Sequence, residues 1–440
     1  MPSTAGREAN WQNRTLFHGD NLAFMRAMNS ETVDLIATDP PFNKGRDFHA
    51  TPDSLAAGAR FQDRWSWERD VHEEWLDQIQ DDYPHVMNVI QGSRSSYGDD
   101  MGAFLCFMAV RLIAMRRLLK PTGSIYLHCD PTASHYLKEL MDAVFGKRNF
   151  RNEIVWCYRG GGVPRTGFAR KHDLIFRYSK GKDVTFNVDD VRIPYSESVM
   201  ESSASRYDKS YRSNKVYSGY RPNEKGKHPE DWWPIQPLMP SDRTERIGWP
   251  TQKPLTLYAR IVAASSNEGD VVLDPFAGCA TTLVAAEKLG RQWVGIDIWQ
   301  QAAQVVRRRL ENEVSLFGAA EADSSVTFTD TPPERTDDGD TAAPFLRIKE
   351  RVAEPDGPRW SRKQMYEHLL AQHGPRCMGC NRTFDDPRYL ELDHNTPRAD
   401  GGINHVSNRI LLCGPCNRLK SNTYTLSGLR RINKQRGYMV

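Results

Sequence analysis

The chain has 440 residues, of which 39% are hydrophobic, so it is long enough for two or more domains with cores of their own. Its net charge of +3 conceals an uneven distribution: residues 319–342 hold seven acidic residues and one arginine, whereas residues 359–440 hold fourteen basic and six acidic residues. No apolar run reaches membrane-spanning length and the N-terminus has no signal-peptide core, which argues against a membrane or secreted protein. We therefore expect a cytoplasmic protein.

Strand-like and helix-like segments alternate through the first 312 residues. Short runs rich in apolar and β-branched residues predict strands, and longer amphipathic or apolar runs predict helices. This alternation is typical of a doubly wound, mostly parallel α/β sheet. We expect a strand and helix over 16–28, strands at 32–38, 125–128, 173–178, 270–273 and 292–297, and helices at 104–119, 255–265, 281–289 and 300–312.

A tetrapeptide, Asp39-Pro40-Pro41-Phe42, directly follows the predicted strand 32–38. The prolines free backbone carbonyls from sheet pairing, and the carboxyl end of a strand is where open α/β sheets bind ligands. Asp39 and the Pro40 carbonyl could each accept an N–H from the amine of a DNA base, while Phe42 stacks on a base rotated out of the duplex. The alternative is a Pro-Pro loop with a buried phenylalanine.

A second motif begins at the end of the predicted strand 270–273. It reads Asp274-Pro-Phe-Ala-Gly-Cys-Ala-Thr-Thr282 and leads into a helix, an arrangement that suits a nucleotide-type pocket. Asp297 ends the next predicted strand, where a ribose-binding carboxylate is expected. Upstream, Lys253 precedes another helix and offers a cation for a carboxylate.

With these motifs, residues 12–312 resemble the amino-group DNA methyltransferases of the permuted β arrangement, including the methyltransferase subunits of type III restriction systems. The stretches 124–130, 152–156 and 245–254 are similar as well. The resemblance implies S-adenosylmethionine as methyl donor and a methyltransferase domain over residues 1–318. One departure is Ala280, which stands where the family has its second loop glycine. The implied cofactor residues are Asp274, Phe276, Gly278 and Thr281 along the cofactor, Asp297 at its ribose and Lys253 near its methionine end.

Two segments interrupt the alternation. Residues 187–249 are rich in Tyr, Arg, Lys and Ser, and their position matches the family's target-recognition region, although an insertion that packs its own tyrosines is an alternative. Residues 47–102 form a second long insertion, which we interpret as a flap or helical cap over the target base. The acidic residues 319–343 contain few large apolar side chains and predict a flexible linker.

The remaining residues, 344–440, contain two Cys-x-x-Cys pairs. In a cytoplasmic protein such pairs favour a structural tetrahedral Zn²⁺ over disulfides, and the metal would stabilise a module too small to fold on its core alone. The four predicted zinc ligands are Cys377, Cys380, Cys413 and Cys416.

Residues 360–425 resemble the HNH endonucleases in their zinc-stapled ββα-metal form. The resemblance implies that His394 is the general base, that Asp393 and Asn417 hold Mg²⁺ or another divalent ion, and that Asn408 orients the histidine. His405 is interpreted as a surface or phosphate contact. A zinc finger that only binds DNA is the alternative.

These features predict a bifunctional enzyme of prokaryotic or phage origin that acts on double-stranded DNA. Its methyltransferase would modify an exocyclic amine, adenine N6 in preference to cytosine N4, and its HNH site would cleave DNA, as in restriction and modification by one polypeptide. The alternative is a solitary methyltransferase whose HNH-like module only binds DNA. A homodimer is possible, and the chain has no G-x-x-x-x-G-K-[ST] motif for ATP.

Overall fold

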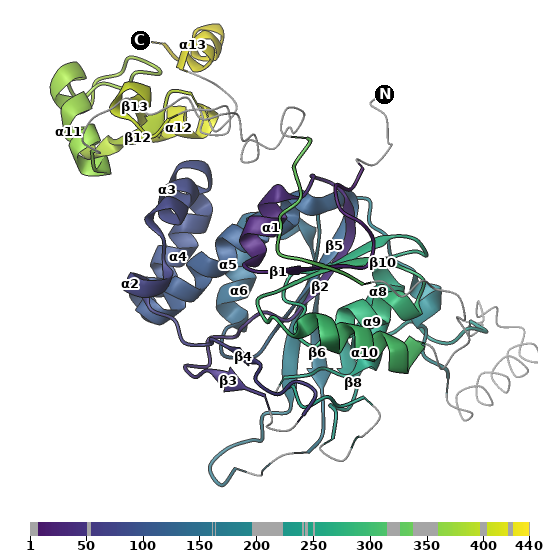
Figure 1. Ribbon diagram of the computed structural model, residues 1–440. Coiled ribbons are helices and arrows are strands. Elements are labelled where there is room, and N and C mark those ends of the chain that lie inside the picture. Colours follow the sequence, from purple (N-terminus) through teal and green to yellow (C-terminus); the bar gives the residue numbers. More distant parts are fainter. Residues whose placement is uncertain are drawn as a thin grey trace, which may run out of the picture. The chain divides into compact units, whose positions relative to one another are not determined.

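The computed structural model divides the chain into two compact units, residues 1–70 with 92–333 and residues 71–91 with 334–440 (Figure 1). None of the described helices combines the length and the apolar character needed to cross a bilayer. The structure describes residues 8–50, 54–160, 162, 164–195, 223–239, 242, 245–249, 251–314, 326–337, 360–396, 403–420 and 426–439.

The described part of the first unit contains a nine-stranded sheet in the order β11-β1-β10-β9-β2-β5-β7-β6-β8. Neighbouring strands are parallel except at β7, which is antiparallel to both β5 and β6. The prediction of a doubly wound, mostly parallel sheet is therefore confirmed. The strands are β1 (Thr15–His18), β2 (Val33–Thr38), β5 (Leu119–Cys129), β6 (Phe150–Cys157), β7 (His172–Ser179), β8 (Trp232–Pro234), β9 (Val271–Asp274), β10 (Gln292–Asp297) and β11 (Thr327–Thr329).

Helices cover both faces of this sheet (Figure 1). Helices α1, α5 and α6 pack together as one group, and helices α8, α9 and α10 pack together as the other. Apolar residues recur at helical spacing along α8, and they pack against the sheet and against α9 because burying an apolar stripe is what stabilises an amphipathic helix. The bounds are α1 (Asn21–Ala27), α5 (Asp99–Leu118), α6 (Ser134–Phe145), α8 (Leu255–Ser265), α9 (Thr281–Lys288) and α10 (Ala302–Val314).

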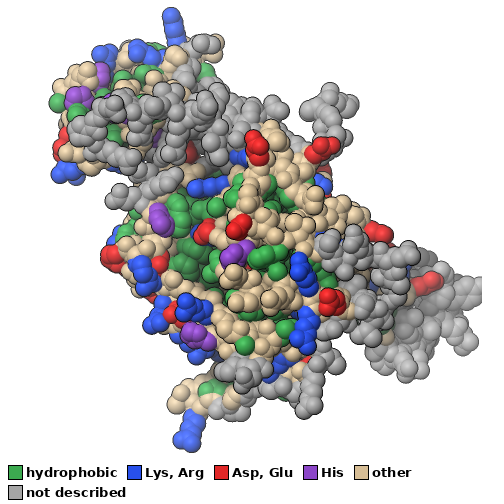
Figure 2. Space-filling view, viewed as in Figure 1, with side chains coloured by type: hydrophobic (Ala, Val, Ile, Leu, Met, Phe, Trp, Pro, Cys, Tyr) green, Lys and Arg blue, Asp and Glu red, His purple; other side chains and the backbone are tan. Residues whose placement is uncertain are grey.

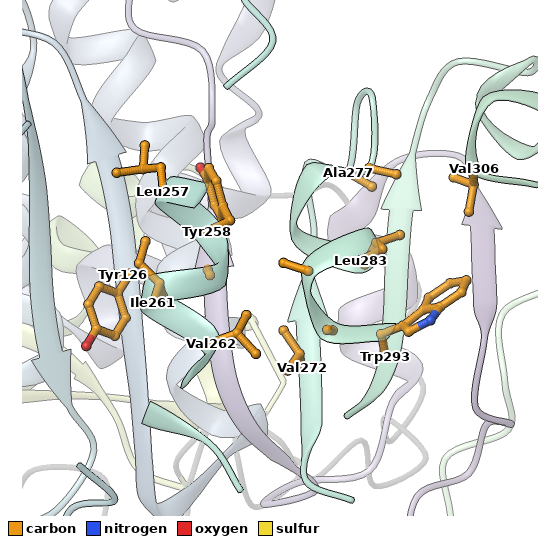
Figure 3. Close-up of a cluster of buried hydrophobic side chains, with 14 of the residues drawn as sticks. Tyr126, Leu257, Tyr258, Ile261, Val262, Val272, Ala277, Leu283, Trp293 and Val306 are labelled. Carbon is orange, nitrogen blue, oxygen red and sulfur yellow. The ribbon is translucent and has the colours of Figure 1, made fainter. Parts of the chain in front are cut away.

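Figure 3 shows the core between α8, α9 and the sheet. Tyr258 and Ile261 of α8, Val272 of β9, Leu283 of α9 and Trp293 of β10 all belong to one buried cluster. Trp293 is completely buried, and its indole N–H donates to Glu287 at 2.7 Å. The cluster fixes α8 and α9 against β9, and hence fixes the loops that enter these two helices.

Strand β2 lies between β9 and β5 in the middle of the sheet. Leu35 pairs with Val272 and Ile36 with Leu273, so the two strands run side by side and end at the same edge. The strands that end before Asp39 and at Asp274 are therefore neighbours, although more than two hundred residues separate them in the sequence.

Two expectations about the connections need correction. Thr327–Thr329, inside the predicted flexible linker, form β11, which pairs in parallel with β1 at the edge of the sheet. Thr327 donates its N–H to the Arg14 carbonyl, and the pairing satisfies backbone groups that a free linker would leave to water. The segment 187–249 also contributes a strand, β8, which pairs with β6; residues 196–222 of the segment lie outside the described residues.

The insertion at 47–102 begins with a small antiparallel ribbon of β3 (Phe48–His49) and β4 (Arg60–Phe61), whose two phenylalanine rings stack at 4.9 Å. Helices α2 (Trp67–Asp70), α3 (Glu73–Asp82) and α4 (Pro84–Ser96) follow before α5. The insertion is therefore largely helical after this ribbon. Its role as a cap over the target base stays a prediction.

The second unit contains the predicted ββα motif. Strand β12 (Leu390–His394) pairs antiparallel with β13 (Arg409–Cys413), and α12 (Gly414–Lys420) follows directly. Helices α11 (Arg362–His373) and α13 (Leu426–Gln435) flank this motif in the sequence, and a small core includes Met365, Leu369, Leu392, Leu411 and Leu429.

Candidate active sites and metal centre

Asp39 stands immediately after β2, with Phe42 buried three residues later. The ammonium of Lys253, from the segment before α8, forms an ion pair with Asp39 Oδ2 and lies 5.4 Å from the centre of the Phe42 ring. Pro40 is buried and Pro41 is half-buried beside them. The structure thus places the tetrapeptide in contact with Lys253. The resemblance assigns Lys253 to the methionine end of the cofactor.

The other predicted cofactor residues gather at the same edge of the sheet. Asp274 ends β9, and its Oδ1 accepts hydrogen bonds from the Thr38 hydroxyl at 2.7 Å and from the Phe276 N–H at 3.1 Å. Asp297 ends β10 and accepts from the Gly278 N–H at 2.6 Å and from the Trp299 N–H at 2.7 Å. Through these hydrogen bonds the two carboxylates stabilise the conformation of the loop between β9 and α9.

Burial raises the pKa of Asp274 to about 7, against the hydrogen bonds from Thr282 and Thr38. A carboxyl group whose pKa is higher in the folded than in the unfolded chain binds its proton more tightly when folded, so its effect on stability becomes less favourable as pH rises from about 4 to about 7. The free energy of unfolding, measured by urea unfolding, should therefore decrease less between pH 5 and pH 8 in Asp274→Asn than in the wild type. An unchanged slope would contradict this assignment.

Two residues of the β9–α9 loop adopt left-handed backbone conformations: Gly278 has φ +49° and Ala280 has φ +64°. A Cβ at Gly278 would lie 3.4 Å from the Trp249 ring, so a glycine suits this position. Ala280 occupies the position where the family has a second glycine, and it adopts the conformation that glycine tolerates best.

Ala280→Gly should therefore stabilise the first unit. A left-handed conformation costs a non-glycine residue roughly 1–2 kcal/mol, and the greater freedom of glycine in the unfolded chain offsets roughly 0.4–1 kcal/mol of that. We expect a net gain of about 1 kcal/mol in the free energy of unfolding. Ala277→Gly is the matched control, since Ala277 is buried in the same loop without a positive φ; it should destabilise, and equal effects of both variants would contradict the explanation.

Several residues of this site had no recognisable signal in the sequence. The Arg309 guanidinium, 2% exposed, donates to the Cys279 carbonyl at 2.7 Å and to the Thr281 hydroxyl at 3.0 Å. Asp63, 1% exposed, accepts the N–H groups of Asn43 at 2.6 Å and Lys44 at 3.1 Å, just after the tetrapeptide. Burial raises the pKa of Asp63 to about 6. Both side chains support loops far away in the sequence, so no local pattern marks them.

His128 also lies in this site and was predicted only as part of a strand. It is 1% exposed on β5, with its ring 5.5 Å from the Phe42 ring and 5.5 Å from the Trp156 ring. Its two nitrogens face Asp39 and Asp173. Polar side chains from β5, from β7 and from the end of β2 therefore meet at this edge of the sheet.

A cavity of about 610 Å³ adjoins the ribbon of β3 and β4. Its lining includes Ile298, which directly follows the predicted ribose ligand Asp297. In Figure 2, lysine and arginine side chains and a histidine gather on this part of the surface. The basic residues that line the cavity are His49, Arg60, Arg64 and Arg69.

The four cysteines of the two Cys-x-x-Cys pairs converge in the second unit. Their sulfur atoms all lie within 4.8 Å of one another, and the sulfurs of Cys380 and Cys413 are 3.9 Å apart. Tetrahedral zinc with Zn–S bonds of about 2.3 Å requires sulfurs about 3.8 Å apart, so the cluster fits this metal. A hydrogen bond from the Cys416 thiol lowers the pKa of Cys377 to about 4, which favours a thiolate ligand.

The predicted nuclease residues lie on the ββα motif or directly next to it. Asp393 and His394 end β12 and are buried, and Lys420 of α12 forms an ion pair with Asp393 at 2.8 Å. The Asn417 amide donates to Glu391 at 2.6 Å, which directs its carbonyl oxygen away from that carboxylate. Arg409 of β13 lies 3.4 Å from His394 Nδ1.

Asn408 makes its hydrogen bonds to the chain that follows His394. Its carbonyl oxygen accepts from the Thr396 N–H at 2.8 Å, and its amide donates to the Thr396 and Ile403 carbonyls at 3.0 Å each. Asn408 thus stabilises the backbone that follows His394. His405 caps the short helix 406–408 through its contact with the Ser407 N–H, which gives it a local structural role.

The fold and these residues define a DNA-modifying methyltransferase joined to a small zinc-type ββα domain. The family described as DNA methylase (N6 and N4) matches residues 33–308, that is 276 of the 440 residues, and the chain belongs to this family. The family described as HNH endonuclease matches residues 377–423, so the second unit carries an HNH domain.

Curated relatives align with the methyltransferase part. The type II methyltransferase M.HpaI of Haemophilus parainfluenzae is 29% identical over 294 residues, 67% of this chain and 73% of that protein. The DNA adenine methyltransferase YhdJ of Escherichia coli K12 is 29% identical over 316 residues, 70% of this chain and 85% of that protein.

The solved structures that match this chain are more distant in sequence. M1.HpyAVI, solved as a complex with SAM, is 18% identical, with a TM-score of 0.36 over 67% of this chain and 98% of that one. The cytosine-N4-specific methyltransferase PvuII is 15% identical, with a TM-score of 0.40 over 70% of this chain and 96% of that one.

Proposed function

We propose that the first unit transfers a methyl group from S-adenosylmethionine to the exocyclic amine of adenine in double-stranded DNA. The pairing of β2 with β9 carries this proposal, because it brings Asp39 and Asp274 to one edge of the sheet. Asp39, which can accept the hydrogens of an amine, thereby lies next to the loop after Asp274, which suits a nucleotide-type cofactor.

S-adenosylmethionine supplies an electrophilic methyl group when bound. The ribose of the cofactor would bind Asp297, and its other groups would lie along the loop at the start of α9, which contains Asp274, Phe276, Gly278 and Thr281. Lys253 would lie beside its methionine end. Asp39 and the Pro40 carbonyl would accept the two amine hydrogens and draw the nitrogen lone pair out of conjugation with the ring. Phe42 would stack on the base and offset part of the few kcal/mol that unstacking costs.

Adenine is proposed over cytosine because the tetrapeptide begins with Asp39, whereas the cytosine-N4 enzymes of the arrangement that this chain resembles more often begin it with a serine. The relation to an adenine methyltransferase of Escherichia coli supports the same choice. Incubation of the full chain with labelled cofactor and plasmid, followed by nucleoside analysis and sequencing, should give N6-methyladenine at one recognition sequence. N4-methylcytosine alone would refute the choice of base.

We propose further that the HNH domain cleaves DNA with His394 as general base. The oxygen donors on its ββα motif, Asp393 and Asn417, suit a hard cation such as Mg²⁺, and the Glu391 contact leaves the Asn417 oxygen available as a ligand. Asn408 would fix His394 through the backbone that follows it. The metal would neutralise charge that develops on the phosphate.

Joined in one chain, the two activities suggest restriction and modification by a single polypeptide. With Mg²⁺, the purified protein should cut unmethylated plasmid and spare plasmid that it has already methylated; equal cutting of both would refute this. One HNH site breaks one strand, so the order in which nicked and linear DNA appear also tests whether two chains act together.

A second candidate function is favoured by the ion pair between Lys420 and Asp393, which already engages the carboxylate proposed as a metal ligand. In that case the HNH domain would only bind DNA and raise the affinity of the methyltransferase. His394→Ala would then leave strand breakage at background, as in the wild type, and leave methylation unchanged. A nicking activity that His394→Ala abolishes would exclude this candidate.

A further inference from the structure

The loop between β6 and β7 carries the most exposed large apolar side chain among the described residues. Phe168 is completely exposed, whereas the next such side chain, Tyr389, is 66% exposed. Single, partly exposed apolar side chains are common on protein surfaces, but a phenylalanine wholly in water contributes nothing to the packing of its own chain. Phe168 is therefore available to a ligand.

The base of this loop is fixed next to the proposed base site. The Tyr158 N–H donates to the Lys171 carbonyl at 3.0 Å, which closes the loop. Two residues further on, Asp173 lies 3.3 Å from His128, and His128 lies 3.4 Å from Asp39. Strand β7 is antiparallel to β5, which is itself parallel to β2, so the loop leaves the edge of the sheet at which β2 ends.

Beyond its base the loop is open to solvent. A Cβ built on any of its three described glycines would meet no heavy atom within 4 Å, chain neighbours aside. The side chains of Arg165 and Arg170 are exposed as well. Residues 158–171 hold four basic residues and no acidic one. This charge complements the phosphate backbone of DNA, which basic side chains contact without regard to sequence.

Only a short stretch of chain separates Phe168 from the site. Five residues span at most about 18 Å when fully extended, so Phe168 lies within about that distance of Asp173. The major groove of B-DNA is about 12 Å wide and about 8.5 Å deep. A duplex whose base is held at Asp39 therefore presents its backbone and its base stack within reach of this loop.

A base that rotates out of a duplex leaves an empty space in the base stack. The loss of its stacking and pairing contacts opposes the rotation. An aromatic side chain has a face on which any base can stack, and apolar side chains of DNA-binding proteins are known to enter the steps between base pairs. A completely exposed phenylalanine with arginines on both sides in the sequence has the chemistry to fill this space.

We propose that Phe168 enters the space that the extruded base leaves in the duplex, while Arg165 and Arg170 bind phosphates of the backbone. This inference rests on the proposed methyltransferase function and deepens it. Phe42 would stack on the base outside the duplex, and Phe168 would stabilise the duplex from which the base came. Because Phe168 does not touch the reacting atoms, it is a positioning residue.

Single-turnover methyl transfer to two short duplexes gives the first test. Both carry the recognition sequence found by sequencing the methylated plasmid; one has thymine opposite the target adenine, and the other has an abasic site there. Phe168→Ala should slow transfer to the paired duplex by about 10- to 100-fold, the effect of losing one base–aromatic stacking contact. Transfer to the duplex with the abasic site should fall less than about threefold, because an unpaired base is easiest to rotate out.

The extrusion of the base is measured separately and without turnover. 2-Aminopurine in place of the target adenine fluoresces more strongly when it leaves the base stack, and it lacks the amine that would be methylated. With the full chain and S-adenosylhomocysteine, the wild type should raise this fluorescence, and Phe168→Ala should reduce the rise by at least about threefold. Phe168→Trp keeps an aromatic face and should give a signal close to that of the wild type.

Phe186→Ala is the matched control. Phe186 is a 38% exposed phenylalanine that follows the other end of β7 in the sequence. This variant should keep the wild-type rates on both duplexes and the wild-type fluorescence signal. Arg170→Gln tests the phosphate contact: it should reduce the slope of log affinity against log salt concentration by about 0.9, equally on both duplexes.

Three results would overturn the inference. Equal slowing on both duplexes would assign Phe168 to folding or to general DNA binding. A rate on the paired duplex within about threefold of the wild type would show that no stacking contact was lost. A change of oligomeric state in Phe168→Ala, measured by light scattering, would place the side chain in a contact between two copies of the chain. A wild type that methylates no DNA would instead refute the proposed function itself, and this inference with it.

Discussion

Cys413→Ser should unfold the HNH domain and leave the methyltransferase unit folded. The four sulfurs lie within 4.8 Å of one another, and Cys413 ends β13 just before α12. Structural zinc contributes on the order of 10 kcal/mol to the folding of such small modules, more than their cores supply. We expect loss of about one zinc per chain, measured by elemental analysis, and loss of one of two unfolding transitions in calorimetry.

Cys157→Ser is the matched control, because Cys157 is a half-buried cysteine of the first unit and lies outside the zinc cluster. It should retain zinc and both transitions. Treatment of the wild type with a strong chelator should reproduce the Cys413→Ser result. A Cys413→Ser protein that keeps its metal and its melting profile would show that zinc does not maintain this fold.

Asp39→Asn should lower methyl transfer by about a thousandfold, within the range known for positioned acid and base groups. The amide keeps the size of the side chain but lacks the charge that accepts the amine hydrogen and pairs with Lys253. Single-turnover incorporation of labelled methyl groups measures the effect. Cofactor binding, followed by calorimetry, should change much less, because we propose that Asp39 binds the base and not the cofactor.

Asp142→Asn is the matched control, because Asp142 on α6 accepts the Tyr178 hydroxyl at 2.7 Å and pairs with Lys138 but is not one of the predicted site residues. A loss of less than about tenfold in Asp39→Asn would contradict the role of this carboxylate in the transition state, since a positioned group of this kind contributes at least about 10²-fold. A fall in cofactor affinity that matches the fall in rate would instead place Asp39 on the cofactor side.

Much of the fold could be predicted because it depends on local pattern. The helix predicted over residues 255–265 has the same bounds in the structure, since its apolar residues recur at helical spacing and pack as one stripe on the core. Strand β11 could not be predicted. Thr327–Thr329 lie in a polar, acidic stretch, and only the free edge of β1 gives their backbone groups partners.

The site was predictable where residues act through a contiguous motif. Asp274 and Asp297 each end a strand and Asp39 directly follows one, and strand ends can be read from the sequence. The contact between His128 and Asp173 depends instead on the antiparallel pairing of β5 with β7, in which His128 lies opposite Ile175. Sequence spacing carries no sign of that register, so the contact of His128 with Asp39 and Asp173 became visible only in three dimensions.

Lys253 has a consequence for how the two ligands bind. Its ammonium is paired with Asp39 on the proposed base side, while its backbone carbonyl accepts the Thr281 hydroxyl at the start of α9 on the proposed cofactor side. A shift of this residue on binding of one ligand must change the other half of the site. By thermodynamic reciprocity, whatever factor the methyl donor adds to the affinity for a flipped base, the base adds to the affinity for the methyl donor.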